Sequence, residues 1–168
     1  MSLRSIDIPS KIRFDLLLVA LEYIRDGRSM GELGEAVRQD ERHAQFLVQN
    51  ARILGFVHGR PSDWHLTRTG AAFLDVDDDR RGLILAEAVL NSRVVSSIVH
   101  HVGSVSKAAS LTQAQIFEFL VENVVVPSRS SAPMETITAD RRASSVRGWI
   151  RWLSKNLPRI EPEAEEMG

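Results

Sequence analysis

Apolar residues recur at helical spacing over most of the first half of the chain, and glycines separate the segments. Residues 11–26 predict one amphipathic helix. Ser29 begins a Ser-x-x-Glu pattern that predicts a short second helix to about residue 38, because the serine can cap it while the glutamate reaches back. Asp40 is the expected cap of a third helix. Its inward stripe consists of Ala44, Leu47, Val48, Ala51 and Leu54.

A glycine- and proline-containing stretch follows this third helix. Residues 55–58 predict a short strand, residues 59–63 a turn, and residues 64–66 the returning strand. Thr67 is then expected to cap a fourth helix. The order of helices and hairpin is typical of a winged helix-turn-helix.

The sequence of residues 66–74, Leu-Thr-Arg-Thr-Gly-Ala-Ala-Phe-Leu, resembles the L-T-x-x-G-x-x-x-L that often follows the wing in bacterial winged-helix proteins. The resemblance covers about residues 11–74. It implies a winged-helix fold but no particular ligand, because many winged helices bind only other proteins.

Two strongly apolar segments open the second half, at residues 80–90 and 93–102. We predict helices, because Ser96 and Ser97 interrupt any strict strand alternation. Segments that are apolar almost all round are expected between the two halves or at a dimer contact. The acidic run before them, at residues 75–79, lacks the ligand spacing of a calcium loop and indicates a linker.

The remaining chain predicts a loop at residues 103–110, a helix capped by Thr112, a proline- and serine-rich loop at 126–133, and a final helix from about Asp140 to residue 157. We expect no clear second wing after the final helix, unless Arg159 and Ile160 begin a strand. The buried face of the final helix is expected to comprise Ala143, Val146, Ile150, Leu153 and Leu157.

The final helix, Thr-Ala-Asp-Arg-Arg-Ala-Ser-Ser-Val-Arg-Gly-Trp-Ile-Arg-Trp-Leu, resembles the last helix of small winged-helix modules in bacterial restriction–modification and related defence proteins. That resemblance covers roughly residues 80–157 and implies a DNA-associated accessory role. The chain shows no nuclease or methyltransferase domain beside it. The matching positions are Thr138, Arg141, Arg142, Val146, Trp149, Trp152 and Leu153.

The expected fold class is therefore mainly α, with two tandem winged-helix-like units and a short β-hairpin wing in the first. The units are predicted at residues 1–75 and 76–160. Residues 161–168 are expected to form an acidic flexible tail.

Nine polar residues form the predicted DNA-contacting set. Four recur at steps of three, four and three on the third helix, so they share its outer face and can donate to phosphates or read base edges. The alternative is an ordinary solvated helix face, and the basic residues of the final helix have the alternative of pairing with acids such as Asp140. The set comprises Arg42, Gln45, Gln49, Arg52, Arg60 at the hairpin turn, Arg68, Arg141, Arg142 and Arg147.

Charge and composition limit the function further. The net charge is −1, which counts against strong DNA binding, although removing the four tail glutamates would leave +3. The chain has no cysteine, which excludes disulfides and fits a cytoplasmic location. The 43% of hydrophobic residues suffice for a core, and no apolar run reaches the length of a membrane span.

None of the five histidines lies in a zinc-binding motif, although His58 and His65 are expected to face each other across the hairpin. We expect no metal, no cofactor and no enzymatic activity. The predicted function is double-stranded DNA binding, in transcription regulation or as an accessory of a restriction or defence system. The alternative is a protein-interaction module or homodimer that uses residues 83–102.

Overall fold

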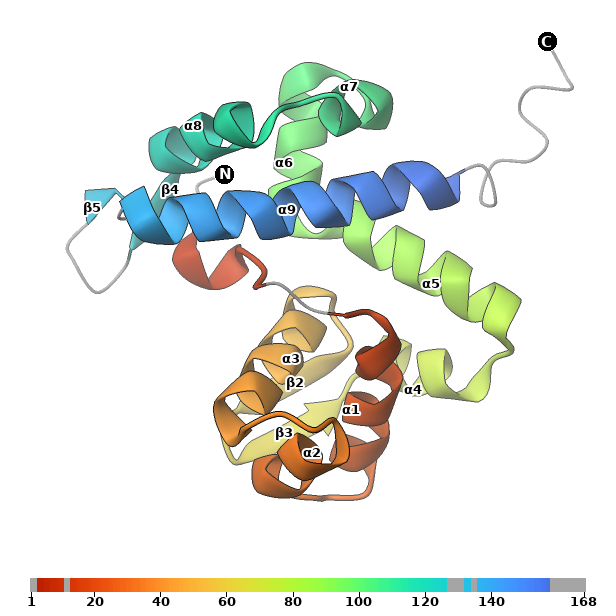
Figure 1. The fold of residues 1–168 in the computed structure, drawn as a ribbon. Coiled ribbons are helices and arrows are strands. Elements are labelled where there is room, and N and C mark those ends of the chain that lie inside the picture. The colour runs from red at the N-terminus through yellow and green to blue at the C-terminus, as the bar shows by residue number, and fades with distance from the viewer. Residues whose placement is uncertain (1–2, 11–12, 127–131, 134–135, 158–168) are drawn as a thin grey trace, which may run out of the picture. The chain divides into compact units, whose positions relative to one another are not determined.

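The computed structural model describes residues 3–10, 13–126, 132–133 and 136–157, and the side chains of residues 125–138 are not described. It divides into two compact units. The first unit is Ser10–Arg81, and the second unit combines Met1–Pro9 with Gly82–Gly168. Both are mainly helical (Figure 1). The predicted tail at residues 161–168 lies outside the described residues.

The first unit has the predicted order of helices and hairpin. Its elements are α1 (Asp15–Arg25), α2 (Met30–Ala36), α3 (Glu41–Ile53), β2 (Val57–Arg60), β3 (Asp63–Leu66) and α4 (Arg68–Asp75).

The three predicted helix caps of the first unit are confirmed. The side-chain oxygens of Ser29, Asp40 and Thr67 accept hydrogen bonds from backbone N–H groups three residues later, at 3.1, 2.8 and 3.0 Å. Each bond satisfies a donor that the first turn of a helix leaves unpaired. The helix starts in this unit are therefore set by local sequence.

The Leu-Thr-x-x-Gly segment has a physical role at the base of the hairpin. Thr67 caps α4 and also donates its hydroxyl to the carbonyl of Gly55, at 2.6 Å. A Cβ at Gly70 would lie 2.0 Å from the carbonyl oxygen of Phe56, so a larger residue cannot fit without backbone movement. Threonine and glycine together fix α4 against the chain that enters the hairpin.

The predicted strand at 55–58 is displaced by two residues. Gly55 has a left-handed φ of +80°, which ends α3, and Phe56 turns into the core, where it stacks on Phe73 with ring centroids 4.8 Å apart. The ladder therefore starts at Val57, opposite Leu66.

The second unit starts within α5, a helix that begins in the first unit and continues across the division. Its elements are β1 (Leu3–Arg4), a 3-10 turn η1 (Ser5–Asp7), α5 (Asp78–Asn91), α6 (Arg93–Val102), α7 (Val105–Ala109), α8 (Gln113–Asn123), β4 (Val124–Val126), β5 (Ala132–Pro133) and α9 (Thr136–Asn156).

The N-terminal residues, which we predicted in the first unit, belong to the second. Leu3 and Arg4 pair in parallel with Val124 and Val125. Asp7 is buried, with ion pairs to Arg4 at 3.6 Å and to Arg93 at 3.7 Å. A local pattern does not indicate a strand pair separated by about 120 residues, so sequence reasoning missed it.

Helix α9 is the centre of the second unit and packs against α6, α7 and α8 (Figure 1). Four of its five predicted buried positions, Ala143, Val146, Ile150 and Leu153, are fully buried, whereas the fifth, Leu157, is half-buried. The helix begins at Thr136 instead of the expected Asp140. Four more residues therefore precede the predicted start.

Residues 103–110 are not the predicted loop, because they contain α7. Ser104 caps this short helix by accepting from the backbone N–H of Lys107 at 3.1 Å. Thr112 then caps α8 in the predicted capping box. An antiparallel pair of β4 and β5 precedes α9, so strand residues occur at both ends of the stretch predicted as a loop at residues 126–133. The expectation about a second wing concerned residues 159–160, which lie outside the described residues.

The apolar segments 80–90 and 93–102 form two separate helices, as predicted. They meet at the buried Ser92 with a bend of 68°. Among the described residues, no single helix is long and apolar enough to cross a membrane, and α5 and α6 reach that length and hydropathy only when taken together.

Candidate nucleic-acid interface

The turn between α2 and α3 is tight, and Gly34 makes it so. A Cβ at Gly34 would lie 2.9 Å from the carbonyl oxygen of Gln39. The backbone N–H of Gln39 donates to the carbonyl of Gly34 at 2.8 Å, and Arg38 takes a left-handed φ of 56°. This close approach sets the start of α3 directly against α2.

The start of α3 is also fixed electrostatically. The Asp40 carboxylate accepts from the backbone N–H of His43 at 2.8 Å and lies 2.6 Å from its ring Nδ1. The backbone hydrogen bond, followed by the bond from the His43 side chain, lowers the pKa of Asp40 below its ordinary value. The cap therefore remains a carboxylate at neutral pH.

The four predicted residues of α3 share one face, as their spacing requires, but they are not equally available. Arg42 and Gln45 are exposed, whereas Gln49 and Arg52 are half-buried. Arg52 Nε donates to Gln49 Oε1 at 3.0 Å, so these two side chains are already bonded to each other. Arg42 and Gln45 are the pair that can reach a ligand without breaking a hydrogen bond or ion pair between the described residues.

Arg42 has no carboxylate within ion-pair distance among the described residues. Its guanidinium lies 5.5 Å from the ring centroid of Phe46, one turn further along α3. The aromatic face stabilises the cation without neutralising its charge. Arg42 therefore keeps the full charge that a phosphate contact needs.

The hairpin carries Arg60 at the end of β2, where it pairs with Asp63 in the ladder. The turn between them contains Ser62, with a φ of 75°. Arg60 is exposed. The structure confirms that His58 and His65 face each other across the strands, with ring centroids 5.6 Å apart. No cluster of three or more potential metal ligands occurs among the described residues.

Arg68 is the first residue of α4 and is exposed. It follows directly after the cap Thr67, so it lies at the base of the hairpin, whereas Arg60 lies at its turn end.

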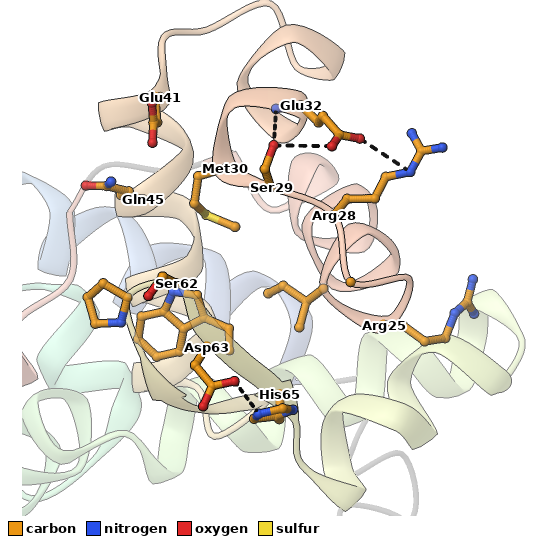
Figure 2. A pocket seen from close by; sticks show the side chains of 14 residues that line it. Arg25, Arg28, Ser29, Met30, Glu32, Glu41, Gln45, Ser62, Asp63 and His65 are labelled. Atoms are coloured by element: carbon orange, nitrogen blue, oxygen red, sulfur yellow. Dashed lines mark hydrogen bonds and ion pairs between the residues drawn. The ribbon is translucent and has the colours of Figure 1, made fainter.

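A groove of about 820 Å³ opens between α3 and the hairpin turn (Figure 2). Glu41 and Gln45 border it from α3, and Ser62 and Asp63 border it from the hairpin. Oδ1 of Asp63 lies 2.9 Å from Nε2 of the His65 ring. Two carboxylates therefore flank the predicted reading face, a feature that helical spacing alone did not show.

The other wall of the groove is the turn between α1 and α2 (Figure 2). Arg28 pairs with Glu32 at 3.7 Å, and Ser29 caps α2 beside them. Two arginines and three carboxylates therefore line the groove, which does not form a basic surface. The first unit as a whole has eleven Lys and Arg and twelve Asp and Glu.

A smaller apolar hollow of about 220 Å³ lies on the opposite flank of α3. Its walls include Leu16, Val37, Phe46 and Leu47, with His43 at the rim. This hollow was not predicted, because its residues come from α1, the α2–α3 turn and α3.

The three predicted arginines of α9 have different environments. Arg141 is exposed. Arg142 is half-buried, its Nη1 donates to the carbonyl of Ile8 at 2.7 Å, and burial lowers the pKa of its guanidinium. Arg147 is also half-buried, and its Nε is enclosed with no hydrogen-bond partner among the described residues. Arg142 thus holds the N-terminal segment against α9, and we remove it from the predicted DNA-contacting set.

The exposed side of α9 instead carries what we term the basic stripe. Its members recur at steps of three and four, so they form one line along the helix. None of its cations has an ion pair with a described residue, and Asp140 is the single acidic residue in the α9 sequence. The stripe comprises Arg141, Ser144, Gly148, Arg151 and Lys155. Arg151 and Lys155 were noted as basic from the sequence but were not assigned to the interface.

Residues 18–157 match the family described as a domain of unknown function, DUF7226. The chain belongs to this family. The match begins within α1 and includes every described element from α2 to α9, so it covers most of both units. No curated protein and no solved structure matches the chain.

Proposed function

We propose that this DUF7226 chain binds double-stranded DNA, and that its first unit is a winged helix-turn-helix. The observation that carries the proposal is the α2–α3 arrangement followed by the hairpin. Gly34 brings the two helices into close contact, and α3 turns Arg42 and Gln45 outward. In helix-turn-helix proteins the second helix of such a pair enters the major groove.

In this arrangement Arg42 and Gln45 contact base edges or phosphates, and Arg60 contacts the backbone from the hairpin. Arginine and glutamine are suited to this, because both can form paired hydrogen bonds with bases. Gln49 and Arg52 act as a bonded pair that supports the face. Arg68 is an additional phosphate contact at the base of the hairpin.

We propose that the second unit is also winged-helix-like but contacts DNA through a different helix. A helix, two capped helices and a strand pair occur there as α6, α7, α8, β4 and β5, in the order that α1 to β3 have in the first unit. By this order the counterpart of α3 is α8, not α9. The outward residues of α8 include Glu118 and Glu122 and no cation, so α8 is unsuited to DNA. The basic stripe of α9 is the phosphate-contacting part of this unit.

The biological setting that we propose is transcription regulation or an accessory role beside a bacterial restriction or defence enzyme. It rests on the resemblance of the α9 sequence to modules of such systems. The proposal requires no catalytic residue within this chain.

A protein-interaction module is the second candidate function, and two observations favour it. The first unit is nearly neutral, and the apolar hollow beside Phe46 could take an apolar side chain from a partner. If the chain does not bind duplex DNA even at low salt, that result would favour the protein-interaction function.

The direct test is duplex binding by the Arg42→Ala variant. We expect affinity for random duplex DNA to fall about 10-fold, because one charged phosphate contact is lost. Arg25→Ala is the matched control: it also removes one exposed arginine that lines the groove, but this residue pairs with Asp26 and its side chain points away from Glu41 and Gln45 (Figure 2). Fluorescence anisotropy measures both. Equal effects of the two variants would contradict a DNA contact of Arg42 on α3.

A further inference from the structure

Helix α5 differs from the other long helices in its surroundings. It makes only sparse contacts with the other described helices and strands. Its buried side carries Leu85, Ala86 and Val89. On the other side Leu83 and Ile84 remain partly exposed, although both are large and apolar. A helix in water normally places polar residues at such positions.

The charges around Leu83 and Ile84 form a self-complementary pattern. Arg80 lies three residues before Leu83, and Glu87 lies three residues after Ile84. All four are on one face, since these spacings return to the same side of a helix. Arg80 and Glu87 are both exposed, and neither has an ion pair with a described residue.

Arg80 and Glu87 are too far apart to satisfy each other within the helix. Seven residues correspond to about 10 Å along the helix axis. An antiparallel second copy of α5 would remove this mismatch. When the two-fold axis passes between residues 83 and 84, Arg80 of each copy meets Glu87 of the other, and Leu83 meets Ile84.

We propose that α5 is a homodimer surface on which two copies of this chain pair antiparallel through Arg80, Leu83, Ile84 and Glu87. A two-fold interface must be complementary to itself, and this sequence of cation, two apolar residues and anion fulfils that condition. The charges fix the direction and register, and the apolar pair supplies the buried centre. Helix α6 contributes little, because its apolar residues Val94, Val95 and Ile98 are already buried within the second unit.

The pairing does not depend on DNA binding. It would place two first units in one particle, as required for a pair of half-sites, but a dimer of a protein-interaction module would satisfy the same geometry.

Charge exchange in the full-length chain tests the proposal. Sedimentation velocity over a wide range of concentrations should show a reversible monomer–dimer equilibrium for the unaltered chain. Arg80→Glu and Glu87→Arg should each weaken dimerisation by about 10-fold or more, because each places like charges together at two symmetric contacts. The double exchange, Arg80→Glu with Glu87→Arg, should return the dissociation constant to within about 3-fold of the original.

Circular dichroism and the melting temperature, measured where every variant is monomeric, serve as the folding control. Leu83→Asp provides a second variant and should abolish the dimer. The proposal is overturned if the unaltered chain is monomeric throughout. It is also overturned if the single reversals leave the dimer unchanged, or if the double exchange does not restore it, because the antiparallel register requires that restoration.

Discussion

The two units contain similar elements in the same order but expose opposite charges on equivalent helices. In the first unit, α3 presents Arg42 and Gln45. In the second, α8 presents Glu118 and Glu122. Both helices begin with a side-chain cap, Asp40 and Thr112, after a short capped helix. The element order therefore repeats, whereas the surface chemistry does not.

This difference shows why the order of elements is a weak guide to function. The first unit has the exposed arginine that a reading helix needs, but its acidic residues outnumber its basic residues by one. The second unit lacks a basic α8 but carries the basic stripe along α9. If the chain binds DNA, base contacts come from the first unit alone, whereas phosphate contacts come from both units.

The largest effect that separates the units is expected from a matched pair of core truncations. Leu33 and Leu153 are both fully buried, one in each unit. Leu33→Ala and Leu153→Ala should each cost about 2–5 kcal/mol, from lost burial and the remaining cavity. Hydrogen exchange resolved by segment should show the loss of protection confined to the unit that carries the substitution. Loss of protection in both units with either variant would show that they unfold as one.

Substituting one glycine in each unit should give the next largest effect, a change in the free energy of unfolding that has opposite signs in the two units. Gly70→Ala should destabilise the first unit by about 1–3 kcal/mol, because the added Cβ meets the Phe56 carbonyl. Gly148→Ala should stabilise α9 by up to about 1 kcal/mol, since no atom lies within 4 Å of that Cβ and alanine favours helix. Chemical denaturation measures both. A neutral Gly70→Ala would contradict the steric role assigned to the Thr-x-x-Gly segment.

Local signals predicted the first unit well. Ser29, Asp40 and Thr67 each cap the expected helix, because a cap depends on residues within one turn. The hairpin was predicted in type but displaced, since the left-handed Gly55 and the burial of Phe56 depend on tertiary packing. The resemblance around Leu66 to Leu74 identified the segment that the structure explains sterically.

The second unit was predicted less well because its decisive contacts are distant in sequence. Pairing of β1 with β4 joins Leu3 and Arg4 to Val124 and Val125, which lie far along the chain. Helix α7 has five residues, too short for a periodic pattern to indicate it. Arg142 is the corresponding case at the candidate site. Its spacing correctly placed it on a basic helix, but its hydrogen bond to the carbonyl of Ile8 could not be predicted from either segment alone.

The smallest effect that we expect concerns the cap of α3 and its pH dependence. The pKa of Asp40 is lowered in the folded chain, so its carboxylate contributes stability above the usual aspartate value of about 3.9. That contribution is lost as pH falls from there through the folded pKa. Asp40→Asn keeps a capping oxygen but removes the charge, so its melting temperature should lose this part of the acid dependence. If Asp40→Asn leaves the dependence of the melting temperature on pH unchanged, the stabilising role of the Asp40 carboxylate is contradicted. Thr112→Ala, at the cap of α8, is the control and should leave this pH dependence unaltered.

The most direct measurement of the proposed DNA binding is a salt-titrated affinity for random duplex DNA, made with the full chain. Each phosphate contact contributes about −0.9 to the slope of log affinity against log salt. Arg42→Ala should reduce the slope by about 1, and Arg151→Ala with Lys155→Ala by about 2, if each cation contacts one phosphate. Absence of binding at low salt, or one slope for all three proteins, would contradict the assignment of DNA contacts to α3 and the basic stripe.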